Sequence, residues 1–298
     1  MTPHSHTVSV IIPSYNRCTL LPRALDSVLQ QTRPALEIIV VDDGSSDATA
    51  VMLEARYPPS RFPHLTLLRQ ANTGVSRARN LGIRHATGDW IALLDSDDEW
   101  LPEKLQRQLD AITEQPDTVL CHSDEIWIRR GKRVNPKHKH RKQGGHIFQH
   151  CLPLCVISPS AALIKRSLLD EVGLFDESLP ACEDYDLWLR ICARYPVLYL
   201  DQPLITKHGG HADQLSQRHW GMDRFRIQAL VNIINRGELS HDDVRAAQTM
   251  LAEKCAIVAQ GAAKRGNHDL ALYYQQLPLQ YPITPPATLS ATATKAHA

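Results

Sequence analysis

The sequence has 298 residues, 43% of them hydrophobic, and its 33 basic side chains are balanced by 32 acidic ones. This length suits one α/β domain with a small appendage, and a formal charge of +1 excludes a global field that would recruit nucleic acid or a membrane. The longest apolar runs, such as residues 8–13 and 91–94, are far shorter than the roughly 20 residues needed to cross a bilayer, so we expect no transmembrane helix.

The N-terminus and the cysteines both favour a cytoplasmic protein. Residues 1–7 contain neither the basic stretch nor the apolar segment of a secretory signal. The seven cysteines are scattered and include no CxxC pair. An odd number of scattered thiols is typical of a reducing compartment, so we expect free cysteines.

The first third of the chain alternates strand and helix patterns. Four apolar runs predict strands, at residues 8–13, 37–43, 64–70 and 89–95. Apolar residues at helical spacing predict a helix after each of the first three strands. This alternation predicts an α/β fold with a mainly parallel central sheet flanked by helices.

Polar clusters follow three of these predicted strands. They occupy residues 13–16, 42–43 and 95–98. In parallel sheets, ligands collect at the carboxyl ends of the strands. We therefore expect the three clusters to face one crevice.

The pattern changes after residue 100, and this half is expected to build the side of the crevice for a second substrate. Further strands are predicted near residues 119–130, 161–166 and 197–205, with a helix over 185–194 before the last of them. Together with the first third, they form a predicted main domain over residues 1–215.

The C-terminal part has a helical composition. Helices are predicted at residues 244–264 and 268–276, and the pair resembles a single tetratricopeptide-type hairpin within an extension over residues 216–280. One such unit cannot bury its own apolar face, so it must pack on the main domain or on a partner. Residues 281–298 are rich in Thr, Ala and Pro and are predicted to be a disordered tail.

Asp95 and Asp97, at the end of an apolar strand, are the first candidates for chemistry. Alternate side chains of a strand point to the same side, so these two carboxylates can converge while Ser96 points away. A hard divalent cation held by carboxylates can neutralise a departing diphosphate. The alternative is that residues 95–99 only end the strand and cap the next helix. Clustered carboxylates without a cation would repel one another, which favours the cation.

Four segments, taken in order, resemble one enzyme family. They are VSVIIPSYNR, EIIVVDDGSSD, NTGVSRARNLGIRHATGDWIALLDSDDEW and CEDYDLWLRI, within residues 7–210. Their sequence and spacing resemble family 2 of the glycosyltransferases, which have the GT-A (nucleotide-diphospho-sugar transferase) fold. The resemblance implies an inverting enzyme that uses Mn²⁺ or Mg²⁺ and moves a sugar from a nucleoside diphosphate donor, UDP- or dTDP-linked, to an acceptor hydroxyl.

The resemblance also implies which residues bind the nucleotide-sugar donor. They are Pro13, Ser14, Tyr15, Asn16, Asp42, Asp43, Asn72, Gly74, Arg77, Arg79, Asp95 and Ser96. Tyr15 would offer a surface to the base, unless it packs in the core, and Asp43 would accept from a base N–H. Forming a turn is the alternative for Asp42. Arg77 and Arg79 lie on different faces of a predicted helix, so only one of them is expected to reach the diphosphate.

The same resemblance implies the metal ligands and the catalytic base. Asp97 would hold the metal directly, with Asp95 and His208 as further ligands; a solvent-facing turn is the alternative for His208. The pair Glu183 and Asp184 begins a predicted helix, and Asp184 would take the proton from the acceptor hydroxyl, with Glu183 as the fallback. Helix N-terminal acids that complement the dipole are the structural alternative.

One strong run of like charge remains, over residues 129–142. Its basic residues are Arg129, Arg130, Lys132, Arg133, Lys137, Lys139, Arg141 and Lys142. We expect a solvated hairpin or loop. The alternative is contact with anionic lipid headgroups, at the inner face of a membrane, or with a phosphate-bearing acceptor. A glycan or lipid-linked acceptor, in cell-surface polysaccharide or glycolipid synthesis, is what the family implies.

Two other functions are alternatives. A sugar-phosphate nucleotidyltransferase shares a related sheet, but it has a Gly-rich loop after the first strand, where this chain has PSYNR. A dinucleotide oxidoreductase fails by the same test. A non-catalytic nucleotide-sugar-binding module is the second alternative, since the C-terminal hairpin could recruit partners.

Overall fold

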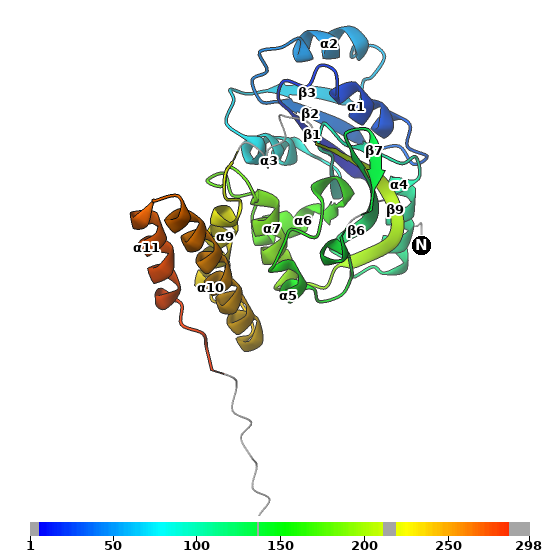
Figure 1. The fold of residues 1–298 in the computed structure, drawn as a ribbon. Coiled ribbons are helices and arrows are strands. Elements are labelled where there is room, and N and C mark those ends of the chain that lie inside the picture. Colours follow the sequence, from blue (N-terminus) through cyan, green and yellow to red (C-terminus); the bar gives the residue numbers. More distant parts are fainter. Residues whose placement is uncertain (1–5, 136, 211–218, 286–298) are drawn as a thin grey trace, which may run out of the picture.

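The computed structural model describes residues 6–135, 137–210 and 219–285. A twisted sheet with helices on both faces forms the body, and a helical arm lies beside it (Figure 1). The arm consists of α9 (Asp223–Asn235), α10 (His241–Lys264) and α11 (His268–Gln276). None of the described helices is long and apolar enough to span a membrane.

The first four predicted strands form the parallel half of the sheet. They are β1 (Val8–Ser14), β2 (Glu37–Asp42), β3 (Leu65–Arg69) and β4 (Trp90–Leu93), in the order β3-β2-β1-β4. Every neighbouring pair among them is parallel. β1 is buried along its whole length, as expected of a parallel strand covered on both faces.

Helices connect these parallel strands, as predicted. They are α1 (Leu21–Leu29), α2 (Thr49–Arg56) and α3 (Val75–His85). A Cβ at Gly82 of α3 would lie 2.5 Å from Cγ2 of Ile11, so this glycine lets α3 pack closely on β1. That packing places the preceding turn of α3, with Arg79, at the end of the sheet.

The second half of the sheet is mixed. It contains β5 (Glu99–Trp100), β6 (Leu120–Arg129), β7 (Lys132–Val134), β8 (Leu163–Lys165) and β9 (Leu198–Gly209). β8 joins the halves by antiparallel pairing with β4 and β6, and β5 and β7 also pair antiparallel, with β9 and β6. β6 and β9 run parallel, with register shifts on either side of Asp124. The longest pairings are parallel, so the predicted α/β fold with a mainly parallel sheet is confirmed.

Alternate residues of the central strands face two hydrophobic cores. In β1, Val10 and Ile12 pack with α1, α2 and α4 (Lys104–Glu114), whereas Ile11 faces the core that includes α3 and α7 (Glu183–Cys192). The short helices α5 (Phe148–Cys151) and α6 (Arg166–Val172) belong to the second core. This period-two division follows from the alternation of side chains along a strand.

The helical arm is an extension of the second core. Ile227 and Leu230 of α9 and Leu251 and Cys255 of α10 join the same buried cluster as α7. The α10–α11 hairpin therefore packs on the main body, which is how a single repeat can bury its face. The predicted boundary at residue 215 lies outside the described residues, as does the predicted tail from residue 286 on.

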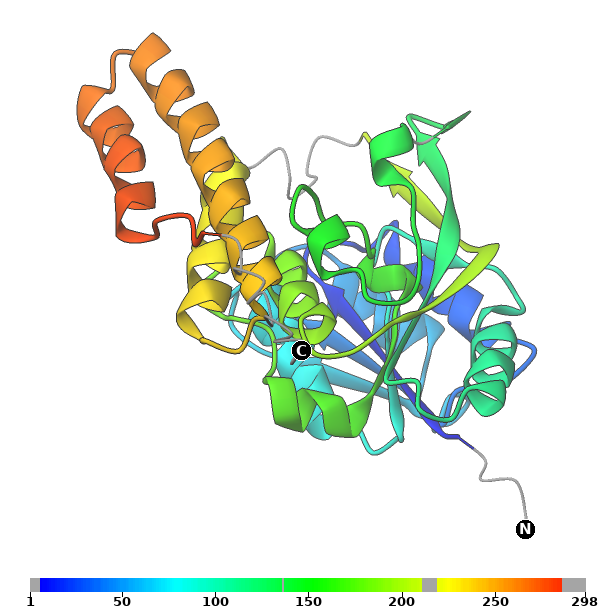
Figure 2. The same ribbon diagram turned by 90° about the horizontal axis from the view of Figure 1, so that it is seen from below.

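Two hairpins project from the body on the same side. One is β6–β7, and the other is α10–α11 at the end of the arm (Figure 2). The predicted hairpin over the basic residues 129–142 is thus a β-hairpin followed by a short 3₁₀ turn, His138–His140. It was expected to be solvated, but Lys142 at its end is buried.

Candidate functional site

A cavity of about 590 Å³ opens at the carboxyl ends of the parallel strands. It is lined by most of the residues that the resemblance assigned to a site: Pro13, Ser14, Tyr15, Asp43, Asn72, Gly74, Arg79, Asp95, Ser96, Asp97, Glu183, Asp184 and His208. Asn16, Asp42 and Arg77 are not among the lining residues. The predicted convergence of polar clusters on one crevice therefore holds for all three strand ends.

Asn16 shapes a loop and does not line the cavity. Its backbone adopts a left-handed conformation, with φ of +53°, which asparagine tolerates better than most residues. Its side-chain oxygen accepts hydrogen bonds from the backbone N–H of Ser46, at 2.8 Å, and of Asp47, at 3.3 Å. It thereby fixes the turn between β2 and α2.

Asp42 and Asp43 have different tasks. Asp42 accepts a hydrogen bond from the backbone N–H of Ser45 at 3.1 Å, so it forms the turn, which was the alternative for this residue. Asp43 lines the cavity and accepts from the backbone N–H groups of Thr73 and Gly74, both at 2.9 Å. Asp43 thus holds the loop that precedes α3 against the end of β2.

Only one of the two arginines of α3 reaches the cavity, as the helical spacing predicted. Arg79 is buried and makes two ion pairs, with Asp95 at 2.7 Å and with Glu183 at 2.5 Å. Burial opposes its charge, but these carboxylates outweigh burial and raise the pKa of Arg79. Arg77 pairs with Glu177 at 2.8 Å on the surface and is half-exposed. Arg77 was expected among the donor-binding residues, and it lies outside the cavity because its side chain leaves the opposite face of α3.

The acidic loop after β4 contains one carboxylate of a different kind. Asp98 is buried, and it accepts from the hydroxyl of Ser160 at 2.7 Å and from the backbone N–H of His208 at 2.9 Å. Burial, followed by the charges of Asp97 and Asp95, raises the pKa of Asp98. Asp98 therefore ties the loop to β9, a role that goes beyond the predicted helix cap.

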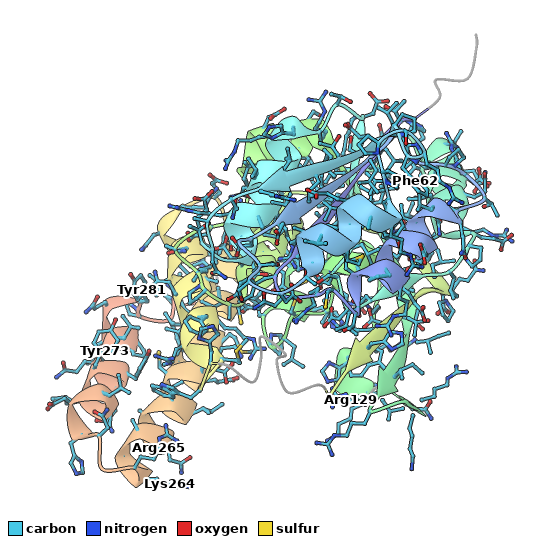
Figure 3. All side chains as sticks on the ribbon, turned by 90° about the horizontal axis from the view of Figure 1, so that it is seen from above. Phe62, Arg129, Lys264, Arg265, Tyr273 and Tyr281 are labelled. Atoms are coloured by element: carbon cyan, nitrogen blue, oxygen red, sulfur yellow. The ribbon has the colours of Figure 1, made fainter. Side chains whose placement is uncertain are left out.

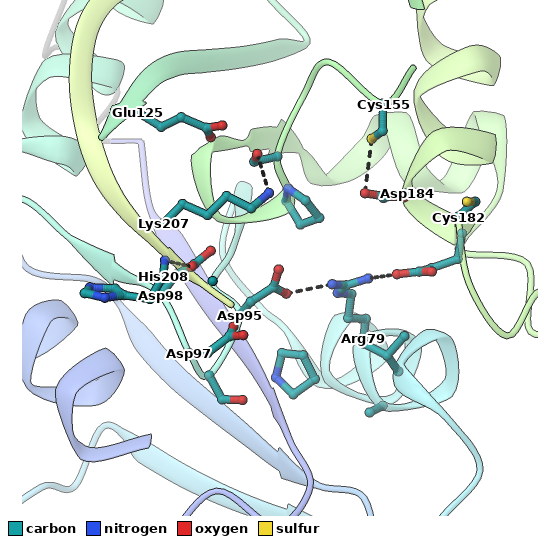
Figure 4. A pocket seen from close by; sticks show the side chains of 18 of the residues that line it. Arg79, Asp95, Asp97, Asp98, Glu125, Cys155, Cys182, Asp184, Lys207 and His208 are labelled. Atoms are coloured by element: carbon teal, nitrogen blue, oxygen red, sulfur yellow. Dashed lines mark hydrogen bonds and ion pairs between the residues drawn. The ribbon is translucent and has the colours of Figure 1, made fainter. Parts of the chain in front are cut away.

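The predicted metal ligands are not all directed to one point. Nε2 of His208 lies 3.1 Å from Oε1 of Glu99, and its ring points away from Asp95 (Figure 4). In the described part of the chain, no three His, Cys, Asp or Glu side chains are grouped to hold a metal ion. The expected set with His208 is therefore not assembled in this structure, because Glu99 engages the imidazole.

Asp95 and Asp97 nevertheless suit a divalent cation whose remaining coordination positions a bound diphosphate would fill. Both line the cavity. Mg²⁺ in proteins is often held by only one or two carboxylates together with phosphate oxygens of the substrate and water. The donor chemistry of these two side chains suits a hard divalent cation on a bound diphosphate.

Asp184 lies at the start of α7 and faces the same cavity. The thiol of Cys155 lies 3.1 Å from Oδ2 of Asp184 and donates to it (Figure 4). Burial, followed by the charge of Asp184, raises the pKa of Cys155, so this thiol keeps its proton and remains a donor. The neighbouring Glu183 turns toward Arg79, so the two acids of the pair have different partners.

Among the charged residues of the cavity, Lys207 and Glu125 were not candidates from the sequence, and Lys142 was expected only as part of a solvated basic run. Lys207 of β9 donates to the hydroxyl of Ser158 at 3.0 Å. Burial opposes its charge, but Glu125 and Asp98 outweigh burial and raise the pKa of Lys207. Glu125 of β6 lies 2.9 Å from Nζ of Lys142, and both side chains are buried.

These residues carry no local motif that would have identified them. β6 and β9 bring them together from positions far apart in the sequence. One signal was available: residues 126–169 contain no acidic side chain, so Glu125 is the last carboxylate before a long basic interval. That position marks it as the nearest partner for the lysines that follow.

One protein family matches the chain over residues 9–173, and its model is described as glycosyl transferase family 2. An uncharacterized glycosyltransferase of Rickettsia prowazekii is 32% identical over 216 residues, covering 71% of this chain and 66% of the relative. One of Rickettsia conorii is 31% identical over 219 residues, covering 72% of this chain but 36% of the relative. One of Bacillus subtilis is 32% identical over 193 residues, covering 64% and 69%. The alignments thus span between about a third and about two thirds of these relatives.

Two solved structures share the arrangement of elements. Staphylococcus aureus TarS, residues 1–349, in complex with UDP-GlcNAc superposes with a TM-score of 0.63 at 18% identity, covering 92% of each chain. A mannosyltransferase of Pyrobaculum calidifontis in complex with GDP-Man and Mn²⁺ superposes with a TM-score of 0.60 at 20% identity, covering 93% of this chain and 85% of that one. At these identities the likeness bears on the fold alone.

Proposed function

This chain belongs to glycosyl transferase family 2 and has the GT-A fold, and from that premise we infer that it is an inverting, metal-dependent enzyme acting on a nucleoside diphosphate sugar. The donor we propose is UDP- or dTDP-linked, and the acceptor is a hydroxyl of a glycan or of a lipid-linked glycan in cell-surface polysaccharide or glycolipid synthesis. The observation that carries the proposal is that Asp95, Asp97 and Asp184 line one cavity with Tyr15 and Asp43.

The donor would bind along the ends of β1 and β2. Tyr15 offers a ring to the base, and Asp43 offers carboxylate oxygens that are already fixed by Thr73 and Gly74. A preorganised acceptor of this kind costs no reordering when a base N–H arrives. Arg79, held by Asp95, adds a positive charge beside the position of the diphosphate.

Asp97 and Asp95 would hold the divalent cation, Mn²⁺ or Mg²⁺, on the diphosphate. The bound cation supplies neutralisation of the negative charge that develops on the leaving group. Asp98, whose hydrogen bonds with Ser160 and His208 keep the loop in place, would position these two ligands. A loop fixed in this way would hold both carboxylates at the cavity, where Asp95 is also paired with Arg79.

Asp184 would accept the proton of the acceptor hydroxyl as that oxygen attacks the anomeric carbon. The Cys155 thiol donates to Oδ2 and orients the carboxylate, and the N-terminus of α7 favours a negative charge at this position. Glu183, paired with Arg79, would position the guanidinium. We place the proton transfer on Asp184 because Glu183 is engaged by Arg79.

A cytoplasmic location is part of the proposal. The seven cysteines of the chain are free thiols. Sγ of Cys151 and Sγ of Cys192 lie 3.9 Å apart and form no disulfide. Free thiols at such a distance are compatible with a reducing compartment.

Incubation with a panel of nucleotide sugars and Mn²⁺ tests the function. We expect release of a nucleoside diphosphate that stops when a chelator removes the metal. Asp97→Ala should lower this turnover roughly 10³-fold, because it removes a ligand of the charge-stabilising cation. Asp117→Ala, which removes an exposed carboxylate after α4, is the matched control and should retain full turnover.

Two results would contradict the proposal. Release of pyrophosphate from a nucleoside triphosphate and a sugar phosphate would make the protein a nucleotidyltransferase. Binding of nucleotide sugars without turnover of any of them would make it a binding module.

A further inference from the structure

The β6–β7 hairpin and the segment that follows it, residues 129–142, concentrate positive charge in one place; we call this segment the basic hairpin. It holds eight of the 33 basic side chains and none of the 32 acidic ones, so the rest of the chain has 25 basic against 32 acidic side chains. The chain as a whole has almost no net charge, but its charge is distributed unevenly, with an excess of positive charge in this segment. Such a local field attracts an anionic partner even where the global field does not.

The charges of the basic hairpin are exposed and are not compensated within the described structure. The side chains in question belong to Arg129, Arg130, Lys132, Arg133, Lys137 and Arg141. None of these six forms an ion pair with a described residue, whereas Lys142 pairs with Glu125 at the base of the hairpin. Several surface arginines elsewhere have carboxylate partners, such as Glu103 for Arg107. The basic hairpin therefore gathers six uncompensated charges in one projecting segment.

The basic hairpin is also a wall of the cavity that contains Asp184. Trp127, Arg129, His140 and Lys142 line that cavity. The guanidinium of Arg129 lies over the ring of Trp127, 5.2 Å from its centroid, and Arg129 stands at the outer part of the hairpin (Figure 3). A molecule whose hydroxyl reaches Asp184 can therefore extend along the basic side chains.

We propose that the acceptor is a phosphate-bearing chain, and that the basic hairpin binds its phosphate groups while one of its hydroxyls reaches Asp184. This inference rests on the proposed function and specifies the substrate class. Guanidinium groups bind phosphate through two parallel hydrogen bonds, and a row of exposed arginines and lysines suits repeated phosphates better than one isolated charge.

Apolar residues argue for a phosphate chain over a membrane surface. Segments that insert into a bilayer interface combine basic residues with large apolar side chains, whereas a basic segment without them is held there by surface charge alone. Within the described residues, the exposed large hydrophobic side chains are Leu36, Val51, Trp220, Ile257, Leu272, Tyr273, Leu279 and Ile283, all of them outside the basic hairpin. The hairpin has charge to attract phosphate but no apolar anchor of this kind.

The test compares two triple variants of the full chain for binding to inorganic polyphosphate. Arg130→Gln, Lys132→Gln and Arg133→Gln together neutralise the end of the basic hairpin. Arg61→Gln, Lys165→Gln and Arg236→Gln together remove the same charge from exposed positions on other elements. Binding is measured by fluorescence anisotropy of labelled polyphosphate over a series of salt concentrations.

We expect the hairpin variant to bind polyphosphate at least about 10-fold more weakly than the unaltered protein, with a salt dependence reduced by roughly two units of slope. The control variant should stay within about twofold. Saturating UDP and Mn²⁺ should leave polyphosphate bound, because the two anions would occupy different parts of the cavity. Equal weakening in both variants would overturn the proposal, since total charge would then explain the binding.

Two further results would also overturn it. If UDP and Mn²⁺ displace polyphosphate, then the polyanion occupies the proposed donor site. If vesicles containing phosphatidylglycerol bind the protein through the basic hairpin more tightly than polyphosphate at equal phosphate concentration, then the hairpin is a membrane contact. Failure of the proposed function itself would appear separately, as absence of nucleotide-sugar turnover in the unaltered protein.

Discussion

Two walls of the cavity differ in how the chain builds them. The N-terminal wall is made at the ends of β1, β2 and β4, where Asp43 follows β2 directly and Asp95 and Asp97 lie in the loop after β4. The C-terminal wall is made by β6, β9 and α7, and its charges depend on pairings between distant segments, as with Glu125 and Lys142. A wall made of strand ends can be recognised from short motifs, whereas a wall made of cross-strand pairings cannot.

The C-terminal wall also shows that neighbours, more than depth, set the charge of a buried acid. Glu125 and Glu183 are 6% and 4% exposed. Burial raises the pKa of both, but Lys142 and Lys207 reverse this for Glu125 and lower its pKa to about 2. For Glu183 burial prevails over Arg79, with a contribution from Asp184, and the pKa rises to about 7.

The largest expected effect tests whether the two walls have different functions. Asp184→Asn should lower transfer to an acceptor by about 10²- to 10⁴-fold, because an amide cannot accept the proton. Donor binding, measured by calorimetry with UDP and Mn²⁺, should remain within about twofold, since the proposed donor contacts lie on the N-terminal wall. Transfer at an undiminished rate would remove Asp184 as the base, and lost donor binding would show that the two walls act together.

The next effect concerns the residue that connects the walls. Above pH 7, where Glu183 is ionised, Arg79→Met leaves the buried Glu183 and the partly exposed Asp95 without their counter-charge, and we expect the free energy of unfolding to fall by about 3–5 kcal/mol. Arg77→Met, two residues away, breaks only a surface pair and should cost less than about 1 kcal/mol. Urea unfolding of both variants makes the comparison. Equal losses of unfolding free energy in the two variants would mean that the buried pairs of Arg79 stabilise the fold no more than the surface pair of Arg77 does.

The smallest effect is a pH dependence that should have opposite signs for the two glutamates. Between pH 4.5, the ordinary pKa of glutamate, and about 7, Glu183 keeps its proton only in the folded chain, so the free energy of unfolding should fall as pH rises. Between about pH 2 and 4.5, Glu125 binds a proton only in the unfolded chain, so this stability should be lost as pH falls.

Glutamine variants test these two windows separately. Glu183→Gln should remove the slope above pH 4.5, and Glu125→Gln should remove the slope below it, each by at most about 1.4 kcal/mol per pH unit. Slopes are compared, because either variant also changes a hydrogen bond and therefore the absolute stability. A slope of the same sign for both residues would refute the assignment of the shifts to their neighbours.

The sequence predicted the N-terminal wall well for a physical reason. Its strands are buried on both faces and appear as continuous apolar runs, and the residues at their ends stay at the edge wherever the helices lie. Helical spacing alone also separated Arg77 from Arg79. What local pattern could not decide was whether a polar residue at such an edge turns inward, as Asp43 does, or forms the turn, as Asp42 does.

The C-terminal wall required the tertiary structure. Lys142 appeared in the sequence as one member of a solvated basic run, and only the return of the chain to β6 buries it beside Glu125. Lys207 lies in a strand whose position next to β6 depends on residues about 80 positions apart. His208 was expected at the metal. The pairing of β9 with β5 places Glu99 close to its imidazole, a contact that no local pattern indicated.

The irregular register between β6 and β9 has a further consequence. Shifts on either side of Asp124 let β9 bulge near Pro203 before it regains regular pairing, with Lys207 opposite Trp127. Because neighbouring residues of a strand face opposite ways, gaining or losing one residue in that bulge would place Thr206 or His208 at the position opposite Trp127 that Lys207 occupies. A change in the length of a short segment would thus exchange a cation for a hydroxyl or an imidazole at this position, without any substitution in the strand itself.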